Sequence, residues 1–211
     1  CVPSRHATST THLRPPGDRG GMRARLALLN AAHNGAESRR NFRRELDADL
    51  AEFDATAGEL PSDFAFDGVV VTGSASSVYD DDDWIAALNE WLAEADERDR
   101  PILGVCYGHQ ALAVALGGRV ESMGEYEIGY RTVERTGDAD DPAEDVLAGL
   151  DEEFTVFTTH QDRVVELPPG ATRLAENDYG VHAFRRGHAW GVQFHPEYDM
   201  ETAERVTRGK D

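Results

Sequence analysis

The chain of 211 residues is poor in lysine and cysteine and has no long hydrophobic segment. Lys210 is the only lysine, so every other basic residue apart from histidine is an arginine. The two cysteines, Cys1 and Cys106, do not form the spacing pattern of a disulfide framework, and a lone cysteine within an apolar motif fits a reducing compartment. No apolar run approaches the roughly 18 residues of a membrane span, and the N-terminus lacks the apolar core of a signal peptide. We therefore expect a cytoplasmic protein that does not associate with membranes.

Acidic residues outnumber lysine and arginine by 40 to 21, which gives a formal net charge of -19. Such a charge repels nucleic acid and anionic membranes, so we expect neither as a partner. The acidic residues could simply form a solvated face, or they could be an adaptation to high salt, where ions screen their repulsion. They are spread over the whole body of the chain, and this favours the halophilic interpretation.

The composition changes once along the chain. Residues 1–21 are polar, basic and rich in proline and glycine, which predicts a disordered leader or a segment outside the natural protein. Met22 would then be a natural start. Residues 22–211 contain no Pro/Gly/Ser-rich linker, and they are numerous enough for one domain with a sizeable core.

Short apolar runs alternate with amphipathic segments. The run GVVVT at 68–72 indicates a strand buried on both faces. A helix is expected over 38–53, where apolar residues recur on one side, with a short strand following at 53–57. The other expected strands are 25–29, 101–105, 127–134, 154–159, 172–176, 181–185 and 189–193, and the other helices begin at 80–83, at 107 and at 200. This order indicates an α/β sheet with mixed strands added in the second half.

Residues 101–110 read PILGVCYGHQ, in which a buried strand runs into Cys106 and a helix begins directly after it. This is the strand–nucleophile–helix arrangement of a nucleophile elbow, with cysteine as the nucleophile. The partial positive charge of the helix N-terminus stabilises a thiolate. Gly104 and Gly108 allow the tight turn, and the Tyr107 N–H points to where an oxyanion would develop. A lone cysteine here would indicate a structural residue, but the whole string favours catalysis.

Residues 188–198 read HAWGVQFHPEY, in which a short strand delivers His195 to its end. Glu197 lies two residues further on, so its carboxylate can reach back to the imidazole and fix its tautomer. The other ring nitrogen can then deprotonate a thiol and later protonate a departing amine. The tripeptide HPE alone would indicate a solvated turn, but together with the elbow it predicts a catalytic base and its orienting acid.

The strings GVCYGHQ and GVQFHPE resemble the paired motifs of the class I (triad) glutamine amidotransferases, including the glutaminase domain of GMP synthetase. The resemblance runs from about residue 69 to residue 198. It implies that Cys106 attacks the glutamine amide and that His195 and Glu197 complete the triad. It also implies a three-layer α/β/α fold over residues 22–211, with a mostly parallel, flavodoxin-like central sheet and extra antiparallel strands.

The loop after the GVVVT strand reads TGSA at 72–75, where the matching loop of GMP synthetase reads SGGP. In that enzyme a glycine N–H forms half of the oxyanion hole, so the resemblance implies that the N–H of Gly73 or Ser74 acts together with that of Tyr107. Ser74 replaces the second glycine, which is a departure from the family pattern. The alternative is a plain strand–helix loop.

Four further residues are expected around the substrate. Gln110 matches the family glutamine that contacts the amino-acid end of the substrate, and Ile128 and Gly129 match a segment whose backbone borders the same pocket. His160 is the best rival base, but with Asp162 it matches a family loop near the active site and outside the triad. The alternative for Gln110 is a surface position on its helix.

The resulting hypothesis is cleavage of glutamine or another γ-glutamyl small molecule through a cysteine thioester. The TGSxxSVY and HPEY variants lean towards stand-alone relatives such as the plant γ-glutamyl peptidases. A glutaminase subunit remains open, and its synthetase would be a separate chain because no SGGxDS loop occurs. A regulatory module and a general cysteine protease are less favoured alternatives. We expect no cofactor, and no metal cluster, Walker loop or dinucleotide fingerprint is evident.

Overall fold

The computed structural model describes residues 23–136 and 145–209, so the predicted leader at 1–21 lies outside the described residues. The described residues form four α-helices, one short 3₁₀ helix and one nine-stranded sheet. The helices are α1 (Gly35–Glu45), α2 (Asp83–Glu97), α3 (Tyr107–Ala115), α4 (Met200–Arg208) and the 3₁₀ helix η1 (Ala55–Ala57). The strands are β1 (Arg25–Asn30), β2 (Asp49–Asp54), β3 (Gly68–Val71), β4 (Ile102–Val105), β5 (Arg119–Arg135), β6 (Glu153–Glu166), β7 (Thr172–Asn177), β8 (Gly180–Arg186) and β9 (Ala189–Val192).

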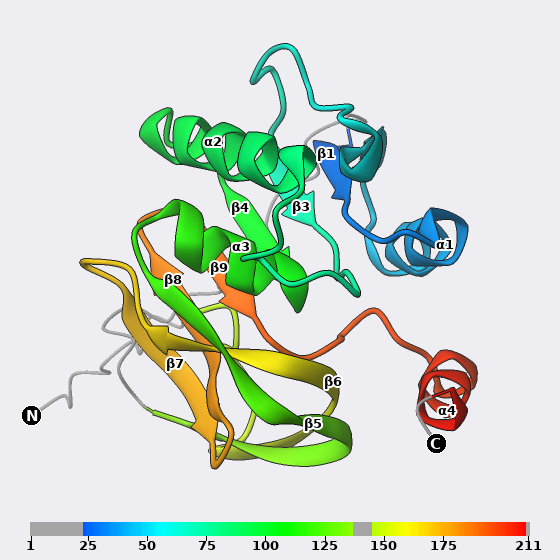
Figure 1. Ribbon diagram of the computed structural model, residues 1–211, viewed down its shortest axis with the longest axis vertical. Helices are drawn as coiled ribbons and strands as arrows, with labels where there is room; N and C mark the ends of the chain where they lie inside the picture. Colours follow the sequence, from blue (N-terminus) through cyan, green and yellow to red (C-terminus); the bar gives the residue numbers. More distant parts are fainter. Residues whose placement is uncertain (1–22, 137–144, 210–211) are drawn as a thin grey trace, which may run out of the picture.

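The sheet has a parallel part and an antiparallel part. Its strand order is β2-β1-β3-β4-β9-β8-β7-β5-β6. The neighbouring strands β2, β1, β3, β4 and β9 pair in parallel. The neighbouring strands β9, β8, β7, β5 and β6 pair antiparallel. Figure 1 shows the antiparallel strands gathered in the lower part of the molecule, below α2 and the parallel strands. The expected α/β fold with added mixed strands is confirmed.

Helices cover both faces of the parallel strands. In β1, Ala27 and Leu29 face the hydrophobic cluster that contains buried residues of α2 and α3. Leu28 points to the opposite face, into a second cluster that contains Phe42 of α1. Adjacent residues of a strand point to opposite faces, so one strand supports both cores. The result is the expected arrangement of three layers.

The helix expected over 38–53 is wrong in its second half. Helix α1 ends at Glu45, and Asp49–Asp54 form β2, which pairs in parallel with β1. Within β2, Leu50 packs against the second cluster and Phe53 against the first, as expected of a strand. Apolar residues spaced by three and four fit an α-helix with one buried side, but over such a short segment they also fit a strand that packs on both faces. The pairing with β1 decides between the two structures.

The carboxyl ends of three parallel neighbours meet at one edge of the sheet. Gly73 follows β3, Cys106 follows β4, and His195 follows β9. In open α/β sheets, ligands bind at this edge. No helix within the described ranges is long and apolar enough to cross a membrane.

Candidate active site

Cys106 has a strained backbone conformation, with φ 54° and ψ -104°, between β4 and α3. A positive φ is uncommon for a residue with a side chain, and such strain concentrates at functional sites. Two glycines make the turn possible. A Cβ on Gly104 would lie 2.2 Å from the carbonyl oxygen of Gly108, and a Cβ on Gly108 would lie 2.4 Å from that of Val71. The sequence GVCYG therefore folds into the predicted elbow.

His195 and Glu197 approach the cysteine from the end of β9. The Nδ1 atom of His195 lies 2.8 Å from Oε1 of Glu197, and both side chains are buried. The backbone N–H of His195 donates to the carbonyl of Phe157 on β6, which fixes the segment. Gly73 lies against both reacting side chains, because a Cβ there would lie 3.1 Å from Cε1 of His195 and 3.9 Å from Sγ of Cys106. The structure therefore brings together the three residues predicted as a triad.

The surroundings of His195 favour its protonated form. Burial alone would lower the pKa of His195, but its interactions with the carboxylate of Glu197 and with a thiolate on Cys106 act in the opposite direction, and that pKa is raised well above 6.5. An imidazolium beside the cysteine stabilises a thiolate, which is the nucleophilic form.

Tyr198 is a site residue to which the sequence motifs assigned no role. Its ring stacks on that of His195, with the centroids 4.1 Å apart and the planes at 17°. Burial raises the pKa of the Tyr198 hydroxyl, so it stays neutral at ordinary pH. The stacked ring limits the orientations open to His195. The string HPEY, in which Tyr198 directly follows Glu197, is the sequence feature that could have indicated this contact.

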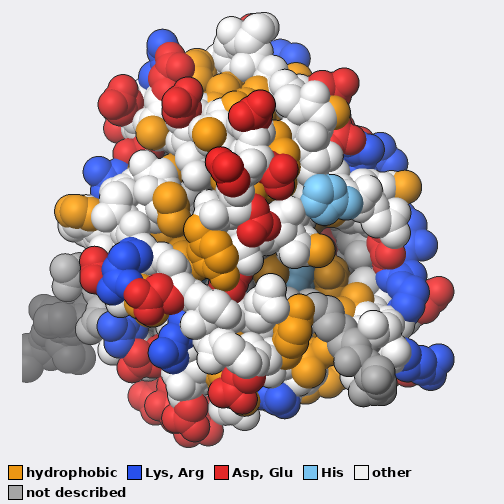
Figure 2. All heavy atoms as spheres, viewed as in Figure 1, with side chains coloured by type: hydrophobic (Ala, Val, Ile, Leu, Met, Phe, Trp, Pro, Cys, Tyr) orange, Lys and Arg blue, Asp and Glu red, His pale blue; other side chains and the backbone are white. Residues whose placement is uncertain are grey.

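Two cavities meet at Cys106. The larger, named here the α1–α4 cavity, has a volume of about 360 Å³ and reaches Asn41 of α1 and Thr202 of α4. The smaller, named the β6 cavity, has a volume of about 40 Å³ and reaches Gln110 and Asp162. Figure 2 shows a hollow in the molecular surface with hydrophobic and histidine side chains at its floor.

The predicted oxyanion donors lie at the junction of these cavities. Gly73 lines the α1–α4 cavity, Ser74 lines both, and Tyr107 lines the β6 cavity. Tyr107 is the first residue of α3, where a backbone N–H has no acceptor within the helix. The hydroxyl of Ser74 accepts from the N–H of Ser76, so this loop is a turn with its own hydrogen bond.

Two of the four residues predicted around the substrate line a cavity, and the other two do not. Gln110 and His160 line the β6 cavity, and both are buried, which excludes the surface alternative for Gln110. The amide nitrogen of Gln110 donates to the backbone oxygen of Asp162 at 2.9 Å, so this donor is already used inside the protein. Ile128 and Gly129 pair with β6 but line neither cavity.

One cluster in the described part of the chain has the composition of a metal site. The ligand atoms of Glu127, His160 and His182 lie within 4.8 Å of one another, and all three side chains are buried. These residues lie on three different strands, far apart in the sequence, and no sequence motif pointed to such a cluster. The expected absence of a metal and of a cofactor stays a prediction.

A cysteine at a strained elbow, a histidine–carboxylate pair and an adjoining cavity are the features of cysteine-dependent amide hydrolases. Residues 33–208 match the family model for glutamine amidotransferase class-I, and the chain belongs to that family. The resemblance inferred from the two motifs is confirmed.

Two curated relatives differ in the activities that their names state. The chain is 36% identical over 150 residues to γ-glutamyl peptidase 5 of Arabidopsis thaliana, covering 68% of this chain and 60% of that protein. It is 41% identical over 131 residues to a glutamine-hydrolysing GMP synthase of Thermomicrobium roseum, covering 62% of this chain and 23% of that protein. The aligned region thus spans less than two thirds of either relative.

Solved structures share the fold. A glutamine amidotransferase from Thermotoga maritima superposes with a TM-score of 0.74 at 25% identity, covering 90% of this chain and 83% of that one. A protein from Thermoplasma acidophilum, described as a putative GMP synthase subunit, gives a TM-score of 0.67 at 24% identity, covering 89% of this chain and 92% of that one.

Proposed function

We propose that this chain hydrolyses a γ-glutamyl amide through a thioester on Cys106. The proposal is carried by the position of Cys106 at a strained elbow, close to the buried His195–Glu197 pair. Gly73 lies against the side chains of both Cys106 and His195. Membership of the glutamine amidotransferase family supports the γ-glutamyl class of substrate.

In the first half of the reaction, the thiolate of Cys106 attacks the γ-carbonyl carbon and the carbonyl electron pair moves to oxygen. The N–H groups of Tyr107 and of Gly73 or Ser74 would stabilise this oxyanion. The C–N bond then breaks, and the imidazolium of His195 gives its proton to the departing nitrogen. The amine leaves, and a γ-glutamyl thioester remains on the cysteine.

In the second half, neutral His195 takes a proton from water as the water oxygen attacks the thioester carbon. The C–S bond breaks, glutamate is released, and the thiolate–imidazolium pair is restored. Glu197 holds the imidazole in one tautomer and stabilises its charge throughout. Because the reaction needs a reduced Cys106, we also infer a cytoplasmic location.

The nature of the leaving amine separates two candidate activities. The α1–α4 cavity beside Cys106 has a volume of about 360 Å³ and would hold the γ-glutamyl group together with its leaving amine. A cavity of this size has room for an amine larger than ammonia, such as an amino acid, and this supports the activity that the plant γ-glutamyl peptidase is named for. The second candidate is a glutaminase that passes ammonia to a separate synthetase chain, and the GMP synthase relatives favour it.

The test is to assay glutamine and γ-glutamyl dipeptides side by side with the purified protein, in dilute buffer and in multimolar salt. We expect release of glutamate from both substrates, a higher kcat/KM for the dipeptides, and no activity in Cys106→Ala. Protein that is silent alone and hydrolyses glutamine only after a synthetase is added would favour the second candidate. Activity retained in Cys106→Ala would contradict both.

A further inference from the structure

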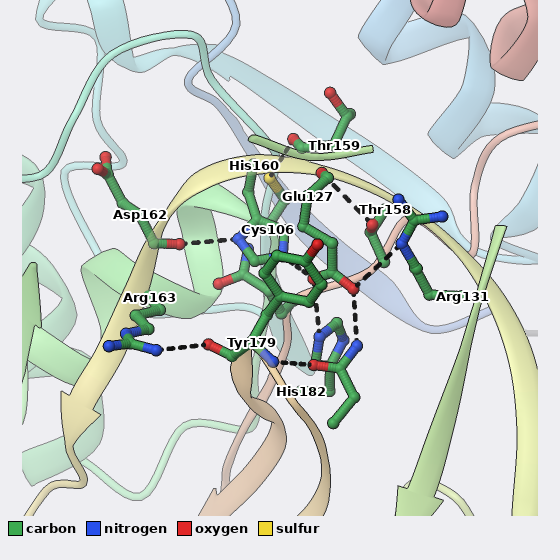
Figure 3. Close-up of polar contacts among 12 residues, drawn as sticks. Cys106, Glu127, Arg131, Thr158, Thr159, His160, Asp162, Arg163, Tyr179 and His182 are labelled. Carbon is green, nitrogen blue, oxygen red and sulfur yellow. Dashed lines mark hydrogen bonds and ion pairs between the residues drawn. The ribbon is translucent and has the colours of Figure 1, made fainter. Parts of the chain in front are cut away.

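A buried charged cluster lies beside the predicted active site, as Figure 3 shows. Glu127 of β5 contacts two histidines through one carboxylate oxygen. Its Oε2 lies 2.7 Å from Nε2 of His160 on β6 and 3.1 Å from Nε2 of His182 on β8. Glu127 is fully buried, and the two histidines are at most 6% exposed. An ionisable cluster so completely removed from water is costly unless its members neutralise one another.

Both ring nitrogens of His160 face hydrogen-bond acceptors. Nε2 faces the carboxylate of Glu127, and Nδ1 lies 2.8 Å from the backbone carbonyl oxygen of Asp162. A neutral imidazole has a single N–H, so it can satisfy only one of these contacts as a donor. An imidazolium satisfies both. His182 differs, because among the described residues only its Nε2 has a hydrogen-bond partner, and a neutral ring is sufficient for that contact.

The other neighbours of Glu127 keep the proton on the histidine. Asn177 donates its amide N–H to Oε1 at 2.6 Å, and the guanidinium of Arg131 lies 3.9 Å from the same oxygen. Burial raises the pKa of Glu127, but hydrogen bonds from His160, His182 and Asn177 outweigh it and lower that pKa to about 2. Glu127 is therefore a carboxylate, and its negative charge stabilises a cationic His160.

The imidazolium holds the wall of the β6 cavity. The backbone oxygen of Asp162 accepts from both His160 and Gln110, at 2.8 and 2.9 Å. The carboxylate of Asp162 accepts in turn from the hydroxyl of Ser77 at 2.5 Å and from that of Tyr79 at 2.8 Å. Ser77 and Tyr79 belong to the loop that carries the predicted oxyanion donor Ser74. A chain of hydrogen bonds thus connects Glu127 to the oxyanion loop.

We propose that His160 is a positioning residue, held as an imidazolium by Glu127, which fixes Asp162 and through it the oxyanion loop above Cys106. The role rests on the proposed function, because it concerns the geometry of the same γ-glutamyl site. His160 does not take the proton of the cysteine. It acts through Asp162, and Glu127 ensures that the N–H on Nδ1 is always present.

The same three side chains could instead bind a divalent cation, because their ligand atoms lie within 4.8 Å of one another. The contacts of 2.7 and 3.1 Å to one carboxylate oxygen are ordinary hydrogen-bond lengths, and this favours the protonated cluster. Metal binding is therefore an outcome that would overturn the proposal.

The first experiment observes the proton directly, by NMR of the full chain with ¹⁵N-labelled histidine. Both ring nitrogens of His160 should give N–H signals, because both face hydrogen-bond acceptors. The charged or titratable groups near His160 include Asp162 of β6, Glu127 and Arg131 of β5, His182 of β8, and His109 of α3, whose pKa burial lowers to about 3. A neutral His160 would overturn the proposal, and so would a shift of its signals when Zn²⁺ is added to metal-free protein.

The second experiment measures kinetics in His160→Phe, which removes both hydrogen bonds and keeps a planar ring. We expect kcat/KM for a γ-glutamyl substrate to fall about 10- to 100-fold, as for a lost hydrogen bond to a charged group. Alkylation of Cys106 by iodoacetamide, followed on its own peptide by mass spectrometry, should be nearly unchanged because that reaction forms no oxyanion. His188→Gln, on the exposed β8–β9 turn, is the matched control.

Glu127→Gln is the conservative rescue, because an amide can donate to Nε2 and leave the only N–H of His160 on Nδ1. It should keep most of the wild-type turnover while the imidazolium signal disappears. Unchanged kinetics in a folded His160→Phe, or an equal loss of Cys106 alkylation, would overturn the positioning role. If the wild type has no γ-glutamyl activity, the proposed function fails on its own, and the NMR result still decides whether His160 is an imidazolium.

Discussion

Replacing Glu197 by glutamine tests how the carboxylate acts on His195. The substitution keeps the shape of the side chain and removes its charge. The segment is held independently of that charge, because the backbone N–H of His195 donates to Phe157 and the backbone oxygen of Glu197 accepts from Arg44 at 2.6 Å. The ring of His195 also stays stacked on Tyr198. We therefore expect an electrostatic loss without a displaced histidine.

The size of the loss follows from the buried contact of 2.8 Å between Nδ1 of His195 and Oε1 of Glu197. A hydrogen bond to a charged group contributes about 1.5–3 kcal/mol. Since 1.36 kcal/mol corresponds to a factor of ten in rate, kcat/KM should fall about 10- to 150-fold. Glu197 is also among the charges that raise the pKa of His195, so its removal should lower that pKa.

The assay is kcat/KM for a γ-glutamyl substrate as a function of pH. The alkaline limb reports loss of the proton from His195, so it should move to lower pH in Glu197→Gln. Glu201→Gln, which removes an exposed charge in the first turn of α4, is the control and should leave the profile unchanged. An alkaline limb that stays in place in Glu197→Gln, with activity near that of the wild type, would refute the assigned role of the carboxylate.

Three further outcomes are expected. Gly108→Ala would place a Cβ 2.4 Å from the carbonyl oxygen of Val71, so overpacking should lower the free energy of unfolding by about 1–3 kcal/mol; a melting temperature equal to that of the wild type would contradict this. The raised pKa of His195 contributes stability that is fully present below the unfolded pKa of about 6.5 and is lost as the pH rises through the folded pKa. Unfolding titrations should show this decline in stability at alkaline pH, and the decline should be weaker in His195→Gln. An identical decline in the wild type and the variant would contradict this prediction. Because the net charge is -19, the melting temperature should rise from dilute buffer to multimolar salt as repulsion is screened, and a value independent of salt would reject the halophilic interpretation.

Local sequence predicted the parts of the fold and site that depend on neighbours in the chain. The elbow at Cys106 follows from an apolar strand, two glycines with no room for a side chain, and a helix, all within ten residues. The contact between His195 and Glu197 spans two residues. The short helix α1 was harder, because the apolar spacing from Phe42 to Phe53 fits both a helix and a strand, and only pairing with β1 decides.

The parts that sequence reasoning missed depend on contacts between distant strands. Glu127 and His160 meet because β5 and β6 pair in register, and His182 joins them from β8. No local pattern links these positions. The stacking of Tyr198 on His195 likewise depends on how the chain turns after β9, although the two residues are close in sequence.

The central claim is a γ-glutamyl thioester on Cys106, and mass spectrometry of acid-quenched protein tests it most directly. Protein mixed with a γ-glutamyl dipeptide and quenched during turnover should carry a γ-glutamyl group on the peptide that contains Cys106. Hydroxylamine should remove the group, and Cys106→Ser should show neither adduct nor turnover. Turnover that leaves no adduct on that peptide and persists in Cys106→Ser would contradict the account.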